Sequence, residues 1–409
     1  MNNKIKLAVA GAVLSAASVA NAGIVIPAGD WTIDINGNVN AFANFTNTDK
    51  SDAVTGTIAT AEDAVGDDDA VGINTGLLPS WLGFTGTTRQ NDVDVSFTIS
   101  FQPNASDNSG AGDNKTPLNR QAFLTFGDKS WGTVKLGKDL GVFAGNAILN
   151  DMTLLGVGGG ASRSGGATTL GGIGTGYIYA AWKGQIAYTT PNMNGFQATI
   201  ALTNPNQGLG TGLVDGVATA VNQDRLGIEG QVQYSWTGDM AGKVWSSFAS
   251  YDVEQGTATS GSDTAATMDS YTATAFDVGV NINSGNLGLT AYYYTGDGLG
   301  TTIFGANGTF TNGGNLKKRD SDGGYLQATY VIPTGTKLGV AYGVSNLDEA
   351  SGETATTLVD SNERWTVGAY HPLTKHLNLV AEYNQIESEA HNDNEIESDT
   401  FSLGAILFF

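Results

Sequence analysis

The sequence has no cysteine, only 8 prolines, and 19 lysine and arginine residues against 40 aspartates and glutamates. Without cysteine, disulfide bonds, thiolate metal sites and a cysteine nucleophile are all excluded. The formal net charge of −21 argues against a nucleic-acid partner, because an acidic field repels polyanions and attracts cations. A membrane-spanning helix needs about 20 consecutive apolar residues, and every apolar run beyond residue 22 is much shorter than that. The remaining chain is therefore either a water-soluble protein or one that crosses a membrane as strands.

The first 22 residues have the three-part layout of a secretory signal. Lys4 and Lys6 precede an apolar run over residues 7–20, and the small-residue pattern Ala20-Asn21-Ala22 ends it. The run, about 14 residues long, is too short for a membrane-spanning helix. We expect cleavage after Ala22 and an exported single-domain chain over residues 23–409.

Alternating polarity is the main structural signal in that chain. Apolar residues from Trp31 to Phe45 share one parity, while Asp34 and a series of asparagines fill most of the other. Residues 93–101 and 226–236 repeat the pattern. Side chains alternate faces along a strand, so each segment has one apolar and one polar face. Several segments are long enough for a tilted membrane strand, which needs about 9–11 residues, whereas strands of soluble proteins average about 5–6 residues.

Sixteen segments of this kind can be recognised. They are residues 31–45, 80–88, 91–101, 119–126, 131–138, 183–190, 195–203, 224–236, 242–252, 271–281, 286–295, 321–332, 336–345, 363–371, 376–386 and 400–409. Their connections alternate between short turns such as 191–194 and long polar stretches such as 46–79 and 387–399. An even strand number with short turns at one rim and long loops at the other is typical of bacterial outer-membrane barrels. The sequence thus predicts an all-β, antiparallel transmembrane β-barrel of about 16 strands, with short periplasmic turns and long extracellular loops.

The last predicted strand is apolar on one parity and ends on Phe409. A final strand of this kind resembles the C-terminal signature of outer-membrane proteins, which implies recognition by the barrel-assembly machinery. A chain that merely ends in a buried strand is the alternative interpretation.

Residues 119–143, NRQAFLTFGDKSWGTVKLGKDLGVF, resemble the fourth and fifth strands of Gram-negative general porins. Residues 78–84 look like the second strand of that family, and residues 183–196 like the sixth strand and its turn. The resemblance implies a homotrimer in the outer membrane, in contact with lipopolysaccharide. It also implies that the third loop, residues 139–182, folds into the lumen and narrows it.

In that family, acidic groups on the third loop face basic groups on the wall, and ring charges and pore width set selectivity. By motif position, Asp151 is the loop carboxylate, and Arg120 and Lys183 belong to the basic wall. Lys138 and Asp139 are candidate vestibule charges, where the fifth strand meets the loop.

Trp81 departs from the family pattern, because a wall arginine is frequent at this position. In a lumen its ring could stack on a sugar-like solute, or it could simply pack under the loop. A less basic wall in a strongly acidic chain predicts a mild preference for cations.

The acidic stretch Glu62-Asp63 with Asp67, Asp68 and Asp69 is a weak candidate metal site. Carboxylates can hold Ca²⁺ or Mg²⁺ and bridge to lipopolysaccharide phosphates, but the stretch lacks the spacing of an EF-hand loop. A solvated loop is the simpler interpretation. We expect no cofactor, and no Gly-x-Ser-x-Gly or comparable catalytic motif points to an enzyme.

Three hypotheses follow from these observations. The first is a diffusion channel for ions and small hydrophilic solutes. The second is a solute-specific channel, for example for sugars, or a surface barrel with a plugged lumen. The third is a secreted all-β adhesin, which requires two packed soluble sheets in place of a tube.

Overall fold

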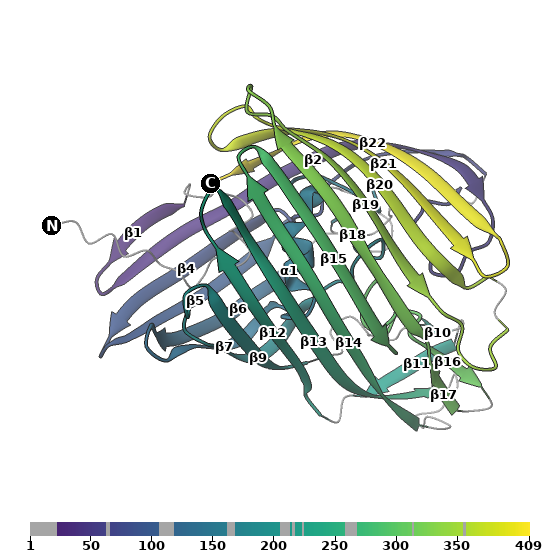
Figure 1. Ribbon diagram of the computed structural model, residues 1–409, viewed down its shortest axis with the longest axis horizontal. Coiled ribbons are helices and arrows are strands. Elements are labelled where there is room, and N and C mark those ends of the chain that lie inside the picture. The colour runs from purple at the N-terminus through teal and green to yellow at the C-terminus, as the bar shows by residue number, and fades with distance from the viewer. Residues whose placement is uncertain are drawn as a thin grey trace.

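The structure is a computed structural model. It describes residues 23–62, 66–105, 118–161, 168–204, 213–214, 217–222, 225–257, 268–312, 315–354 and 357–409. The predicted signal segment 1–22 and Asp63 of the acidic stretch lie outside the described residues. Figure 1 shows long, tilted strands that surround an interior crossed by irregular chain and one short helix.

Sixteen of the strands pair antiparallel in chain order, and β22 pairs back onto β2, which closes the ring. The predicted sixteen-stranded barrel is confirmed. The strands are β2 (Trp31–Ser51), β4 (Trp81–Gln90), β5 (Val93–Gln102), β6 (Leu118–Asp128), β7 (Gly132–Leu140), β8 (Trp182–Thr189), β9 (Phe196–Thr203), β12 (Gly227–Trp236), β13 (Met240–Thr257), β14 (Met268–Ser284), β15 (Leu287–Asp297), β18 (Asp320–Val331), β19 (Lys337–Leu347), β20 (Val359–Pro372), β21 (Leu377–Ala390) and β22 (Glu395–Phe408).

The polarity of the barrel is inverted relative to a soluble protein. On β2 the outward-facing Val39 and Phe45 are 57% and 48% exposed, whereas Asn38 and Asn40, on the other parity, are 0% and 1% exposed. Exposed apolar side chains on every second residue are stable only against hydrocarbon, and in lipid the closed ring satisfies all backbone hydrogen bonds between strands. Two packed soluble sheets would bury this apolar parity, so the adhesin hypothesis does not fit the fold.

Several strands continue beyond the predicted ends. Residues 387–399 were expected to form a long loop, but β21 and β22 continue through them and leave only residues 391–394 as the connection. Their acidic residues keep the outward parity, while Ile386, Ser388, Ile396 and Ser398 are buried on the inner one. Carboxylates are compatible with a β-strand where the strand extends beyond the lipid into water. The acidic composition of residues 387–399 therefore did not indicate a loop.

Short strands were not predicted because they lie within segments interpreted as a terminus or as loops. β1 (Ile24–Ala28) forms a hairpin with β2 through Gly29, whose φ of 66° favours glycine, and β3 (Asp69–Asn74) pairs with another part of β2. The others are β10 (Leu213–Val214), β11 (Val217–Asn222), β16 (Thr309–Asn312) and β17 (Asn315–Lys318).

Among the described residues, the first connection, the third loop and the connection after β15 enter the barrel. The third loop, residues 141–181, contains the short helix α1 (Gly145–Asn150) and the 3₁₀ turn η1 (Met152–Leu155), and α1 lies inside the ring in Figure 1. The amide of Tyr179 in this loop donates to the Thr302 carbonyl at 2.9 Å, so the connection after β15 reaches it. In the first connection, Ile58 N–H donates to Asn362 Oδ1 on the inner wall at 3.0 Å. Only the third loop was expected inside. Among the described residues, no helix is long and apolar enough to cross a membrane.

Candidate functional site

The third loop is fastened to the inner wall by carboxylates that bind its backbone. Glu229 of β12 accepts hydrogen bonds from the amides of Val142 and Phe143 at 2.6 and 2.9 Å. Glu382 of β21 does the same for Val157 and Gly158 at 2.8 and 2.9 Å. Hydrogen bonds to a charged acceptor are about twice as strong as neutral ones. The first half of the loop is therefore held at both of its ends by acidic side chains of the wall, Glu229 and Glu382, which come from strands far apart in the sequence.

Between these two anchors the wall contributes further contacts. Asp277 of β14 accepts from the Ala144 amide at 3.2 Å. Gln327 of β18 brackets the loop, since its Oε1 accepts from the Met152 amide at 2.6 Å and its Nε2 donates to the Asn150 carbonyl at 3.1 Å. The loop thus follows the wall from β12 toward β21.

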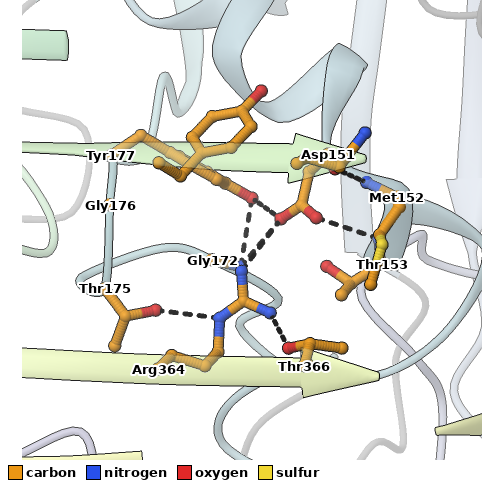
Figure 2. A network of polar contacts seen from close by, with 12 residues as sticks. Asp151, Met152, Thr153, Gly172, Thr175, Gly176, Tyr177, Arg364 and Thr366 are labelled. Carbon is orange, nitrogen blue, oxygen red and sulfur yellow. Dashed lines mark hydrogen bonds and ion pairs between the residues drawn. The ribbon is translucent and has the colours of Figure 1, made fainter. Parts of the chain in front are cut away.

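Asp151 lies at the centre of a buried polar network, shown in Figure 2. Its Oδ2 accepts from the hydroxyl of Tyr177 at 2.8 Å and from the Gly172 amide at 3.0 Å, while Oδ1 accepts from the Thr153 amide at 2.9 Å. Arg364 Nη2 of β20 lies 3.8 Å from the same Oδ2. The structure therefore places the predicted loop carboxylate opposite a wall arginine, but that arginine is Arg364, which the sequence did not single out.

Gly172 shows why the loop is rich in glycine at this point. A Cβ on this residue would lie 2.8 Å from Arg364 Nη2 and 2.9 Å from Asp151 Oδ2. Only glycine lets the backbone pass close enough for its amide to bind Asp151. Arg364 also donates to Thr175 Oγ1 at 3.2 Å and to Thr366, which fixes its guanidinium.

Lys183 of β8 is buried, and its ammonium binds other side chains of the barrel wall. Its Nζ lies 2.6 Å from Glu229 Oε1 and donates to the hydroxyl of Tyr251 at 2.9 Å. The predicted basic residue is therefore present on the inner face, but its charge is neutralised by the carboxylate that also binds the loop. Glu229 could have been noticed in the sequence as a charged residue on the inner parity of its strand.

Trp81, the first residue of β4, is 9% exposed. Its indole N–H donates to Asn36 Oδ1 at 3.3 Å, and its ring meets Phe408 edge-on with a centroid distance of 6.5 Å. These contacts favour the packing interpretation over a face open to solute.

Arg120 lies at an irregularity in β6. Ser100 pairs with Gln121 and Phe101 with Asn119, so Arg120 is an extra residue in its strand. This explains why the strand alternates poorly in the sequence. The side chain is half-buried, and none of the ion pairs found between described residues includes it.

Lys138 and Asp139 point to opposite faces of β7. Asp139 is buried on the inner face, where it binds Lys135 and accepts from Gln121 Nε2 at 3.1 Å. Lys138 shares the parity of Leu136, which pairs with the outward-facing Ile186, and its Nζ donates to the Asn119 carbonyl at 3.0 Å. Lys138 therefore lies on the outside of the barrel.

The acidic stretch of the first connection is at the surface. Asp67, Asp68 and Asp69 are exposed, and Asp69 accepts from Asn47 Nδ2 at 3.1 Å. Within the part of the chain that the structure describes, no three histidine, aspartate or glutamate side chains come together in a group that could hold a metal ion.

The wall of β4, β5 and β6 differs from the wall that carries the loop. Between the described residues, no hydrogen bond joins the third loop to these strands. Their inner faces carry hydroxyl pairs, such as Thr85 with Thr98 at 3.1 Å and Ser96 with Thr125. The interior thus has one wall that the third loop covers and one polar wall to which the third loop forms no hydrogen bond among the described residues.

Comparison with known proteins agrees with this architecture. A family model described as Gram-negative porin matches residues 7–391, and no curated protein matches the chain. Among solved structures, the outer membrane channel DcaP of Acinetobacter baumannii superposes with a TM-score of 0.69 at 15% identity, covering 94% of this chain and 99% of that one. Salmonella typhi OmpF, in complex with daunomycin, gives 0.59 at 16% identity, covering 94% and 100%. A loop-deletion mutant of Vibrio cholerae OmpT gives 0.57 at 15% identity, covering 93% and 100%.

Proposed function

Because the chain belongs to the Gram-negative porin family, and is thus an outer-membrane channel, we propose that it lets ions and small hydrophilic solutes diffuse passively across that membrane. The observation that carries this proposal is the inverted barrel with a loop fastened inside it. A closed ring with an apolar exterior and a polar interior is stable around water, and the loop narrows that interior. The process needs no covalent chemistry and no cofactor.

The permeation path in this proposal runs between the third loop and the wall of β4 to β7. Asp151 and Lys183 contribute to the constriction mainly by holding the loop in place, since both charges are buried in ion pairs. Arg120, Lys135 and Asp139 supply the charges of the facing wall. Lys138 is left out because it faces outward, and Trp81 is assigned a packing role.

A mild preference for cations is part of the proposal. The chain carries 40 acidic against 19 basic residues, and this field raises the local concentration of cations at both mouths. The buried carboxylates of Glu229 and Asp151 contribute little to it, because Lys183 and Arg364 compensate their charge.

The surroundings of the channel are proposed on the same basis. Residues 1–22 act as an export signal, and Phe409 presents the end of β22 to the barrel-assembly machinery. The active form is a homotrimer embedded among lipopolysaccharide, and a trimer form of Vibrio cholerae OmpT is among the similar structures.

A solute-specific channel is the second candidate function. It is favoured by the two additional segments that enter the barrel, since Leu299 and Phe304 of one and Ala59 of the other are buried. A lumen narrowed at several levels discriminates between solutes more strongly than one narrowed by a single loop.

Planar-bilayer recording with a salt gradient tests the proposal. The refolded protein should form stable channels whose reversal potential has the sign of a weak cation preference. Absence of conductance would refute the channel, whereas an anion-selective reversal potential would refute the charge argument alone. Strong block by one class of sugar would favour the second candidate.

A further inference from the structure

Lys243 is an interior lysine without a carboxylate partner among the described residues. Lys243 lies on the inner face of β13, three residues from the end of the strand at the short-turn rim. It is half-buried, and none of the ion pairs found between described residues includes it. Lys183, by contrast, is buried against Glu229. The ammonium of Lys243 is thus available to a negative charge from the lumen.

Asn146 of α1 places a second donor beside this ammonium. Lys243 Nζ donates to Asn146 Oδ1 at 2.7 Å. An ammonium can only donate, so the oxygen of the amide must face Lys243, and Nδ2 on the same carbon lies next to it. Asn146 is 8% exposed, and its Nδ2 has no acceptor among the described residues. Burying a donor without an acceptor is costly, which points to an acceptor that enters from outside the chain.

Trp245 supplies a third donor on the same strand. The Nζ of Lys243 lies over the face of the Trp245 ring, 5.2 Å from the ring centroid, and Trp245 is 2% exposed. The indole nitrogen also has no acceptor among the described residues. A positive charge therefore lies beside two neutral N–H donors that have no acceptor among the described residues.

The surrounding structure holds these groups in position. The Trp245 ring covers Gly279 of β14, where a Cβ would lie 2.2 Å from it, and stacks on Tyr292 at 6.4 Å. The hydroxyl of Tyr325 donates to the Ala147 carbonyl at 2.9 Å and so fastens α1 to the wall. A site whose donors are already oriented loses little entropy when a ligand binds.

We propose that Lys243, Asn146 and Trp245 form a binding site for the oxyanion group of a small solute, a carboxylate or a phosphate. The site lies where α1 meets the wall on the short-turn side of the third loop. An anion that enters from that side pauses there on its way through the constriction, which opposes the cation preference of the chain as a whole. This inference rests on the proposed channel function and names a solute class for it.

Two lysine-to-methionine variants distinguish an anion-binding site at Lys243 from a general electrostatic effect of positive charge in the lumen. Lys243→Met removes the charge at the site. Lys337→Met removes the same charge from another interior position, the first residue of β19, where Nζ lies 4.8 Å from the centroid of the Tyr370 ring. Trp245→Phe keeps an aromatic ring at this position but removes the indole N–H together with the five-membered part of the indole. Each variant is refolded and recorded in planar bilayers in potassium chloride, while succinate, or inorganic phosphate in a separate series, is added to one side at a time.

We expect succinate or phosphate to interrupt the wild-type current at lower concentration from the side of the short turns. Lys243→Met should raise the half-blocking concentration at least about tenfold, and Trp245→Phe about threefold, while Lys337→Met should change it less than about twofold. Which of the two anions binds more tightly identifies the oxyanion.

Two results would overturn the inference. One is a wild-type channel that neither anion interrupts from either side. The other is an equal loss of block in Lys243→Met and Lys337→Met, which would mean that the lumen field alone is responsible. Conductance in potassium chloride without added anion reports on the channel itself, so failure of the site and failure of the proposed function are distinguishable.

Discussion

Lys183 Nζ lies 2.6 Å from Oε1 of Glu229, and the other oxygen of the same carboxylate binds the first amides of the third loop. Glu229 thus compensates a buried positive charge and anchors the constriction with one side chain. Charge balance in the wall and the position of the loop are therefore coupled in this barrel.

Replacing Glu229 by glutamine should destabilise the barrel by about 3–5 kcal/mol, because Lys183 would remain buried without its counter-charge. The measurement is the temperature at which the folded band on unheated gels is lost. Glu349→Gln, at an exposed position after β19, is the matched control and should leave that temperature unchanged. Equal behaviour of the two variants would show that the pair contributes nothing to stability.

Asp151→Asn should loosen the third loop without unfolding the barrel. The amide cannot compensate Arg364, and one of its two positions for accepting hydrogen bonds becomes a donor that faces other donors. Single-channel records should show more current noise and a changed open-channel conductance, whereas Asp239→Asn in an exposed turn should match the wild type. Quiet channels of wild-type conductance would remove Asp151 from the constriction.

Trp81→Ala should cost stability but leave permeation intact. Truncating a buried tryptophan costs about 3–5 kcal/mol through the cavity it leaves. We expect a lower unfolding temperature with unchanged conductance and unchanged sugar permeation. Wild-type stability with altered sugar permeation would instead assign Trp81 to the lumen.

The extracellular connections should respond to acid through Glu353. Burial raises the pKa of this carboxyl, but hydrogen bonds from Arg319 and the Ala350 amide outweigh it and bring the pKa below its ordinary value. A lowered folded-state pKa stabilises the pair above the unfolded value of about 4.3, and this stabilisation is lost as the pH falls through the folded-state pKa. Protease cleavage in residues 348–358 should therefore stay slow at neutral pH and accelerate in acid.

Glu353→Gln should already be cleaved rapidly at neutral pH. Cleavage of the wild type that does not depend on pH, measured with a protease active over the whole range, would contradict the role of this pair.

The barrel could be predicted from the sequence because its signal is local. Val39 and Asn40 alternate on one strand, and lipid on one side and water on the other act on neighbouring residues directly. The interactions in the candidate site were harder to predict from the sequence. Asp151 and Lys183 were found by motif position, but their partners Arg364 and Glu229 come from distant strands, and no local pattern links them.

Two further features depend on geometry that the sequence does not display. Arg120 breaks its strand's alternation because it is an extra residue in the ladder, and only the register reveals this. Ile58 lies in a polar connection that was expected outside, yet its amide binds the inner wall. Such tertiary contacts override local composition.

Cysteine labelling along β12 tests the central claim most directly, since the native chain contains no cysteine. Val232 and Tyr234 are exposed on the outer face, while Gln231 and Gln233 share the inner face of the same strand. In the barrel reconstituted in lipid, a water-soluble thiol reagent should label Gln231→Cys and Gln233→Cys and spare Val232→Cys and Tyr234→Cys. Labelling with the opposite parity, or without any alternation, would contradict an apolar face in hydrocarbon around a water-filled interior.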